Sequence, residues 1–134
     1  MKEIITGTFA TVSTKVDETN TAKSAKSGSL NVFATPFMIA LMEEATCKAV
    51  SQFLENDETT VGTNINVAHS KASGLGENIT AKATIAEVDG RRITFDVSAT
   101  DESENVIGSG KIERFVVNSE KFMKKVESKW NSNQ

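Results

Sequence analysis

The stretch FATPFMIALMEEATCKAV, residues 33–50, is an almost uninterrupted apolar run that holds the only proline of the chain and two adjacent glutamates. Thr35 is a good N-cap and Pro36 suits the first helical position, so a helix is predicted from Thr35 to about Leu54. Its first half is apolar on every side, which indicates a helix enclosed by other elements. An unpaired carboxylate there is costly, so the glutamates either face water or have a function.

Segments rich in β-branched residues or in period-two alternation lie on both sides of this helix. One precedes it, residues 3–14, and four follow it, residues 59–70, 77–88, 92–100 and 106–117. In the second segment the apolar face is expected to hold Val61, Thr63, Ile65, Val67 and His69. The polar stretch between the first strand and the helix is predicted to be a loop, and residues 119–130 a short C-terminal helix.

This order of elements predicts an α+β fold. An antiparallel sheet of about five strands that must cover one very apolar helix is expected to curl around it, which is the hotdog architecture. We expect a single hotdog domain over residues 1–134. Such a sheet leaves an edge strand open, and pairing of two edges predicts a homodimer.

Composition excludes several classes of function. With a net charge of -3 the chain has no basic surplus for nucleic acid. Cys47 is the only cysteine, so neither a disulfide within the chain nor a cysteine zinc cluster is expected. No run of about 18 apolar residues occurs, so we expect no membrane association and a cytoplasmic location.

Three positions remain as candidates for chemistry: Thr35, the Glu43 and Glu44 pair, and His69. At about 100° per residue, Glu43 lies about 80° around the helix from Thr35, whereas Glu44 lies about 180° away and is expected to face solvent. The rise from Thr35 to Glu43 is about 12 Å, so a third group or a substrate must lie between them if they cooperate. His69 ends the apolar face of its strand and can fill that place as a base.

Each candidate also has an ordinary structural explanation. Thr35 can be an N-cap only, His69 a surface or core residue at a strand end, and Glu43 a solvent-facing residue. Cys47 is explained as small helix packing rather than as a nucleophile. The residues alone leave these alternatives open.

Three stretches, FATPFMIALMEEA, VGTNINVAHSKASGLGENITAKATI and GSGKIERFVV, resemble the fluoroacetyl-CoA thioesterase family of the hotdog superfamily. The resemblance extends from about residue 30 to residue 120. It implies an active site of Thr35, Glu43 and His69. It also matches Arg114 to an arginine of the last strand, and we expect Arg114 with Gly74 and Gly76 of the loop after His69 to contact substrate.

The implied activity is hydrolysis of a short-chain acyl-CoA thioester to the free acid and CoA, with no metal or organic cofactor. His69 would draw a proton from Thr35 or from a water, and Glu43 would orient the imidazole or hold the water. Whether Thr35 becomes acylated stays open. A hotdog hydratase and a non-catalytic module that binds acyl-CoA or a small apolar ligand are the alternatives. The cations considered for the CoA phosphates are Lys71, Arg91, Arg92, Lys111 and Arg114.

Overall fold

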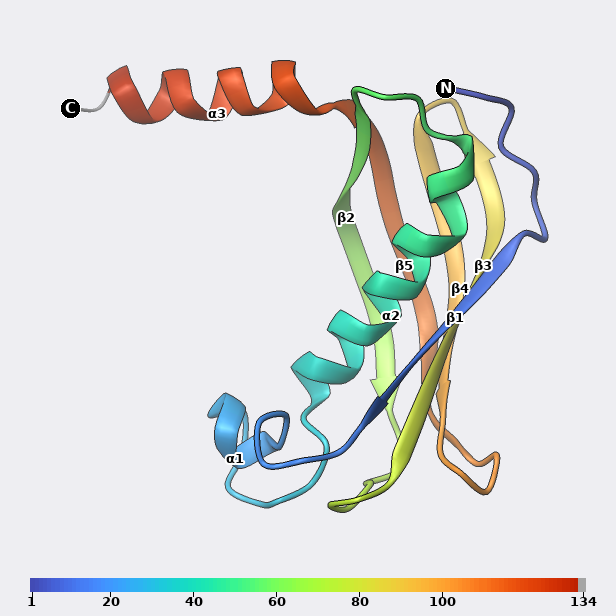
Figure 1. Ribbon diagram of the computed structural model, residues 1–134, viewed down its shortest axis with the longest axis vertical. Coiled ribbons are helices and arrows are strands. Elements are labelled where there is room, and N and C mark those ends of the chain that lie inside the picture. Colours follow the sequence, from blue (N-terminus) through green and yellow to red (C-terminus); the bar gives the residue numbers. More distant parts are fainter. Residues whose placement is uncertain (133–134) are drawn as a thin grey trace.

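The computed structural model describes residues 1–132, so the last two residues of the predicted domain lie outside the described part. Its elements are β1 (Phe9–Lys15), α1 (Ala22–Ala25), α2 (Thr35–Val50), η1 (Ser51–Phe53), β2 (Glu58–His69), β3 (Asn78–Asp89), β4 (Arg92–Thr100), β5 (Val106–Asn118) and α3 (Ser119–Ser132). The strands form one antiparallel sheet in the order β1-β3-β4-β5-β2, which curls around α2 (Figure 1). The predicted hotdog architecture is therefore confirmed.

The core lies between α2 and the inner face of the sheet, to which β3, β4 and β5 contribute. Alternate residues of β3 and β4 point at the helix and are at most 4% exposed, namely Ile79, Ala81, Ala83, Ile85, Ile93, Phe95, Val97 and Ala99. Met38 and Met42 of α2 are fully buried against this face. Each large side chain buried in this way contributes about 1.5–3 kcal/mol, so the period-two pattern of these strands determines which side of the sheet α2 covers.

Strand β2 departs from its predicted alternation. Its register with β5 shifts between Gly62 and Asn64, which is a β-bulge. Before the bulge, Val61 pairs with the exposed Phe115, and after it Ile65 pairs with the buried Ile112. Directly paired residues point to the same face, so Val61 and Ile65 lie on opposite faces rather than on one. The expected common face of this strand was wrong because a bulge adds one residue to the period.

Helix α2 differs from the prediction in two respects. Ala34, not Thr35, is the N-cap, and no side chain caps the helix. The helix is also not enclosed in the described chain, because Phe37 is 40% exposed and Ala40 and Glu44 are exposed. The sheet covers one side of α2 only. The sequence did not show this because the uncovered side begins with apolar residues.

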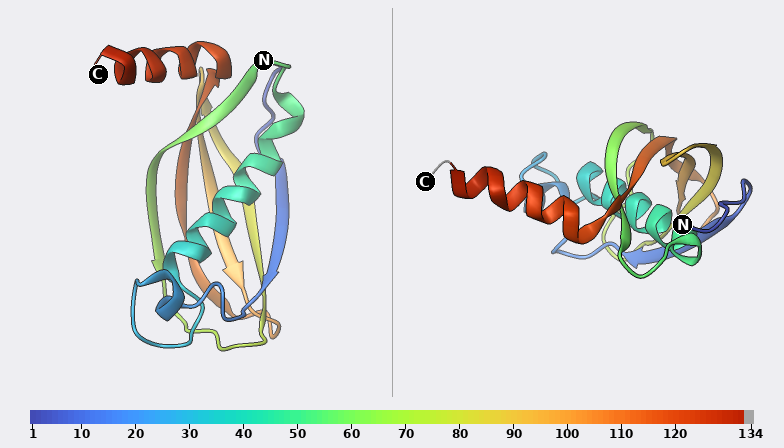
Figure 2. Two further views of the ribbon diagram at one scale, coloured as in Figure 1. Left: turned by 60° about the vertical axis from the view of Figure 1, so that its left-hand side comes forward. Right: turned by 90° about the horizontal axis from the view of Figure 1, so that it is seen from above.

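The two ends of the sheet carry different segments (Figure 2). The register places residues 16–34, 70–77 and 101–105 at the end where α2 begins. The predicted first loop contains the short α1 in this region, and β1 begins six residues later than expected. Helix α3 lies at the opposite end and projects past β2. No helix of the described residues is long and apolar enough to cross a membrane.

Candidate active site

The first residue of α2 meets the last residue of β2. The Oγ1 atom of Thr35 lies 2.7 Å from Nδ1 of His69, although the two residues are 34 positions apart in the chain. Thr35 is exposed and His69 is half-buried. The hydroxyl of Thr35 bonds the imidazole instead of a helix amide, which explains why it does not act as the N-cap.

The protonation of His69 follows from these contacts. Burial lowers the pKa of the imidazole from its ordinary value of 6.5, although the nearby backbone of Lys71 opposes the change. The ring is therefore neutral near pH 7. When the Thr35 hydroxyl donates to Nδ1, the ring proton sits on Nε2, a buried atom with no hydrogen-bond partner among the described residues. Nδ1 is then the basic atom, and it already holds the hydroxyl.

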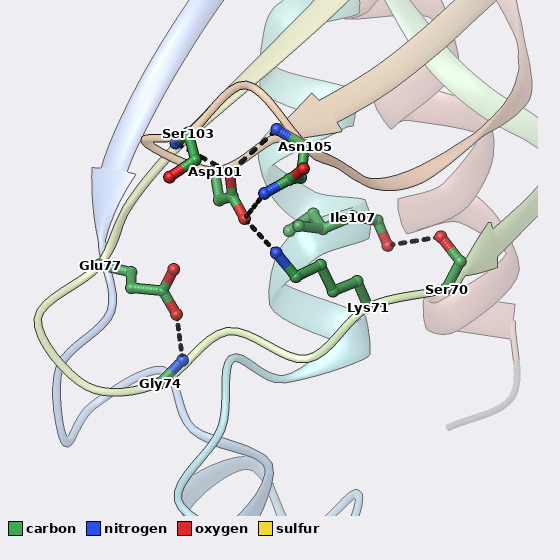
Figure 3. Close-up of polar contacts among 8 residues, drawn as sticks. All are labelled: Ser70, Lys71, Gly74, Glu77, Asp101, Ser103, Asn105 and Ile107. Atoms are coloured by element: carbon green, nitrogen blue, oxygen red, sulfur yellow. Dashed lines mark hydrogen bonds and ion pairs between the residues drawn. The ribbon is translucent and has the colours of Figure 1, made fainter.

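The segment directly after His69 is tied to the start of β5, and the Ser70 hydroxyl donates to the carbonyl of Ile107 at 3.2 Å (Figure 3). The amides of Ser70 and Lys71 both donate to the carbonyl of Ile107, at 2.7 and 3.2 Å. The Lys71 Nζ donates to Asp101 Oδ2 at 2.8 Å, and the Asp101 side chain is only 3% exposed. These contacts hold the imidazole end of β2 in place.

Asp101 is the centre of that anchor. Its carboxylate accepts a hydrogen bond from Lys71, from the amides of Ser103 and Asn105 and from the side-chain amide of Asn105. The Lys71 contact is the main cause that lowers the pKa of Asp101 to about 2. The Asp101 carboxylate therefore stays ionised at neutral and mildly acidic pH.

The loop from residue 70 to residue 77 also supports the approach to Thr35. The amide of Phe33 donates to the carbonyl of Ser73 at 2.8 Å. Gly74 donates its amide to Glu77 Oε2 at 2.6 Å, and Gly76 has a φ of +91°, which favours glycine. The same loop thus touches the entry to α2 and makes the turn into β3 with a glycine at the position of positive φ.

A cavity of about 260 Å³ opens beside the Thr35 and His69 pair. It is lined by residues of the segments 22–35 and 69–72, and Lys71 is the one candidate phosphate-binding cation among its lining residues. Gly74 and Gly76 do not line it. A larger cavity of about 550 Å³ lies at the opposite end of the sheet, but its lining of Lys2, Leu54, Asn118 and residues 55–58 includes no such hydroxyl and imidazole pair. We therefore place the candidate site at the smaller cavity.

Glu43 and Arg114 form a second polar pair on α2. Arg114 is 7% exposed and donates from Nη1 to Glu43 Oε2 at 3.3 Å. It also donates to Thr60, from Nε to Oγ1 at 2.8 Å and from Nη2 to the carbonyl at 3.0 Å. The structure thus joins Glu43 to Arg114 and Thr35 to His69. The predicted contact of Glu43 with His69 is not among the hydrogen bonds of the described chain.

Gly62 makes room for the second pair. A side-chain carbon at this position would lie 3.2 Å from Glu43 Oε2 and 3.5 Å from Arg114 Nη1. Gly62, Thr60 and Asp101 are not among the site residues predicted from the sequence. A glycine inside a strand is a signal for a bulge or a close approach, so Gly62 was detectable from the sequence. Asp101 gave no such signal.

No group of three or more His, Cys, Asp or Glu side chains in residues 1–132 is placed to hold a metal ion. Cys47 is exposed and free, and it lies on α2 beyond Glu43 rather than at the cavity. The chemically useful groups at the cavity are a hydroxyl, a neutral imidazole and the N-terminus of α2.

Known proteins share this sequence and fold. Residues 16–120 match the family of fluoroacetyl-CoA-specific thioesterases. A fluoroacetyl-CoA thioesterase from Streptantibioticus cattleyicolor is 45% identical over 98 residues, which make up 73% of this chain and 70% of the relative.

Solved structures agree over almost the whole chain. The fluoroacetyl-CoA thioesterase FlK matches with a TM-score of 0.89 at 36% identity, covering 96% of this chain and 98% of that one. A variant of that enzyme in complex with acetyl-CoA matches with a TM-score of 0.87 at 37% identity, covering 93% and 98%. A thioesterase superfamily member from Thermus thermophilus matches with a TM-score of 0.88 at 26% identity, covering 98% and 99%.

Proposed function

Because the chain belongs to the fluoroacetyl-CoA-specific thioesterase family of hotdog proteins, we propose that it hydrolyses a short-chain acyl-CoA thioester at the Thr35 and His69 pair. The observation that carries the proposal is the 2.7 Å contact between Thr35 Oγ1 and His69 Nδ1 beside a cavity. An activated hydroxyl next to a neutral imidazole is the arrangement that acyl transfer requires. The acyl group in this proposal is acetyl, fluoroacetyl or one of similar length.

In the proposed reaction the thioester carbonyl lies at the start of α2. The amide groups and the positive end of the helix dipole there stabilise the oxyanion that forms when the carbonyl is attacked. His69 Nδ1 takes the proton of Thr35, or of a water that the Thr35 hydroxyl holds, and the CoA sulfur leaves as the thiol with a proton. Thr35 acylation and direct water attack both use this pair.

Glu43 and Arg114 have a separate part in the proposal. Their ion pair is fixed by Thr60 and lies under the edge strand beside Gly62. We assign to it the far side of the substrate site, where Glu43 holds a water or orients charge and Arg114 fixes the position of the carboxylate. Gly74 and Gly76 act indirectly here, because they shape the loop that supports Thr35 and do not line the cavity.

The proposal includes a homodimer. Strand β2 is 12 residues long, and it forms one edge of the sheet with Ile65 43% exposed. An open edge of this length is a template for another strand. A two-fold pairing of β2 with its copy covers the β2 edge of each copy. A cytoplasmic location belongs to the same proposal, since acyl-CoA is the substrate.

A thiol-release assay with acetyl-, fluoroacetyl-, butyryl- and crotonyl-CoA tests the function. We expect release of free CoA from the short saturated esters, and its loss in Thr35→Ala. Conversion of crotonyl-CoA without thiol release would show a hydratase. Tight acyl-CoA binding without turnover would show a binding module. Either result would overturn the proposal.

A further inference from the structure

Helix α3 is amphipathic, yet its apolar side is uncovered. Its four large apolar side chains are 39–66% exposed and fall within about 100° of one another around the helix: Phe122, Val126, Trp130 and Met123. Figures 1 and 2 both show α3 leaving the body of the chain and passing beyond β2, the edge strand. A helix with this pattern buries its apolar stripe against another protein surface or a lipid surface.

A second exposed apolar group lies at the opposite end of the sheet. Leu30 is 66% exposed, Leu75 50% and Val106 53%. They belong to three different segments, yet the strand register brings these segments to the end where Thr35 and His69 meet. Within one chain α3 cannot reach them, because β2 alone spans about 36 Å between the two ends.

An antiparallel pairing of two β2 edges brings these two groups together. The two-fold axis of such a pair places the His69 end of one β2 next to the Glu58 end of the other. Glu58 pairs with Asn118, the residue directly before α3. Each α3 then starts beside the active-site end of the other copy and points over it.

We propose that α3 of one copy packs its apolar stripe on the active-site end of a second copy, around Leu30, Leu75 and Val106. This assignment rests on the homodimer of the proposed function. By symmetry each copy gives one helix and receives one. The received helix then forms an outer wall of the end that holds the cavity.

Length and charge both fit this partner. The 14 residues of α3 span about 21 Å, enough to cross about four strands at 4.8 Å each. The helix carries four lysines and two glutamates, a net +2. The segments 16–34, 70–77 and 101–105 carry six carboxylates and three lysines, a net -3. In this arrangement the positively charged helix meets a negatively charged surface, and its apolar stripe meets the exposed apolar residues of that surface.

Cross-linking between labelled copies tests the contact directly. Trp130 is replaced by photoreactive p-benzoylphenylalanine in the full chain, and ¹⁵N-labelled and unlabelled copies are mixed, irradiated and digested. We expect heavy-to-light cross-links from position 130 to residues 26–34, 70–77 or 101–106. The same group at Ser128, on the opposite side of α3, is the control and should give none. Cross-links within one copy only, or to other segments, would overturn the proposal.

The dimer constant gives an independent readout. Val126→Glu puts a charge in the apolar stripe, and we expect it to raise the dimer dissociation constant at least about tenfold in sedimentation equilibrium. Ser128→Glu adds the same charge on the other face and should change the constant less than about twofold. Equal constants for both variants would overturn the proposal. So would loss of binding to anionic vesicles in Val126→Glu with an unchanged dimer, because that would assign the stripe to a lipid surface.

Activity separates this inference from the proposed function. An active dimer that gives no heavy-to-light cross-links would leave the thioesterase intact and remove only the role of α3. Cross-links between copies of a protein that hydrolyses no acyl-CoA would support the contact of α3 and overturn the proposed thioesterase activity.

Discussion

The two polar pairs on α2 are built in opposite ways. Thr35 and His69 form an uncharged contact whose hydroxyl is exposed, beside a cavity. Glu43 and Arg114 form an ion pair whose guanidinium is 7% exposed and is held twice more by Thr60. The first pair can exchange a proton with a substrate, whereas the second is a charge held in one place. This difference supports the proposal that Thr35 and His69 react with the substrate and that Glu43 and Arg114 support them.

Removal of the imidazole should have the largest effect. His69→Ala is expected to lower kcat by about 10²- to 10⁴-fold, the usual contribution of a positioned base. The melting temperature should change little, because His69 is only half-buried. Asn66→Ala, on the exposed part of the same strand, is the matched control for thiol release. Unchanged hydrolysis in His69→Ala would mean that the two pairs have the reverse roles.

Removal of the Arg114 guanidinium should mainly lower the free energy of unfolding. Arg114→Met leaves Glu43 and Thr60 without their partner, and breaking a buried ion pair costs about 3–5 kcal/mol. Because Glu43 is 35% exposed, we expect a smaller loss, about 2 kcal/mol in urea unfolding. Arg92→Met removes an exposed arginine from its salt bridges and should cost less than about 0.5 kcal/mol. Equal losses would show that the burial of Arg114 does not stabilise the fold.

The two adjacent glutamates of α2 test whether the bond to Arg114 gives Glu43 a role that Glu44 lacks. Glu43→Gln keeps the shape of the side chain and removes its charge, and we expect about a tenfold loss of kcat with little change in stability. Glu44 is exposed, so Glu44→Gln should keep nearly full activity. Thiol release by both variants under the same conditions is the measurement. Equal losses of activity would show that the different positions of Glu43 and Glu44 around the helix do not give them different roles.

The pH dependence should show the smallest effect and the finest distinction. Because burial lowers the pKa of His69, kcat/KM should fall on acidification with a midpoint below 6.5. Asp101, with a pKa of about 2, does not titrate in this range. Since Glu43 bonds Arg114, Glu43→Gln should move the midpoint by less than about 0.3 unit. A larger shift to lower pH would place a Glu43 carboxylate against the imidazole, as it would be if a second copy supplied it.

Folding stability should follow the same group. The pKa of His69 is lower in the folded chain than in the unfolded one, so protonation favours the unfolded state. The stability due to the neutral ring is present above pH 6.5 and is lost as the pH falls through the folded pKa. His69→Ala should remove this part of the pH dependence of urea unfolding.

Local patterns in the sequence were sufficient for much of the fold. Pro36 placed the start of α2 to within one residue, and the alternation through Ile79 and Ile93 identified the inner faces of β3 and β4. Such patterns work because a helix or strand repeats its geometry over neighbouring residues. The resemblance to a family added Thr35, Glu43 and His69 as candidates, and their catalytic roles stay predictions.

Only the tertiary structure decided which of these groups meet. Thr35 and His69 are 34 residues apart and Glu43 and Arg114 are 71 apart, so no local period relates them. The bulge at Gly62, which reverses the faces of β2, comes from pairing with β5. The anchor of Lys71 on Asp101 likewise joins two loops. Contacts of this kind depend on strand register and turn geometry, which become defined only when the sheet closes around α2.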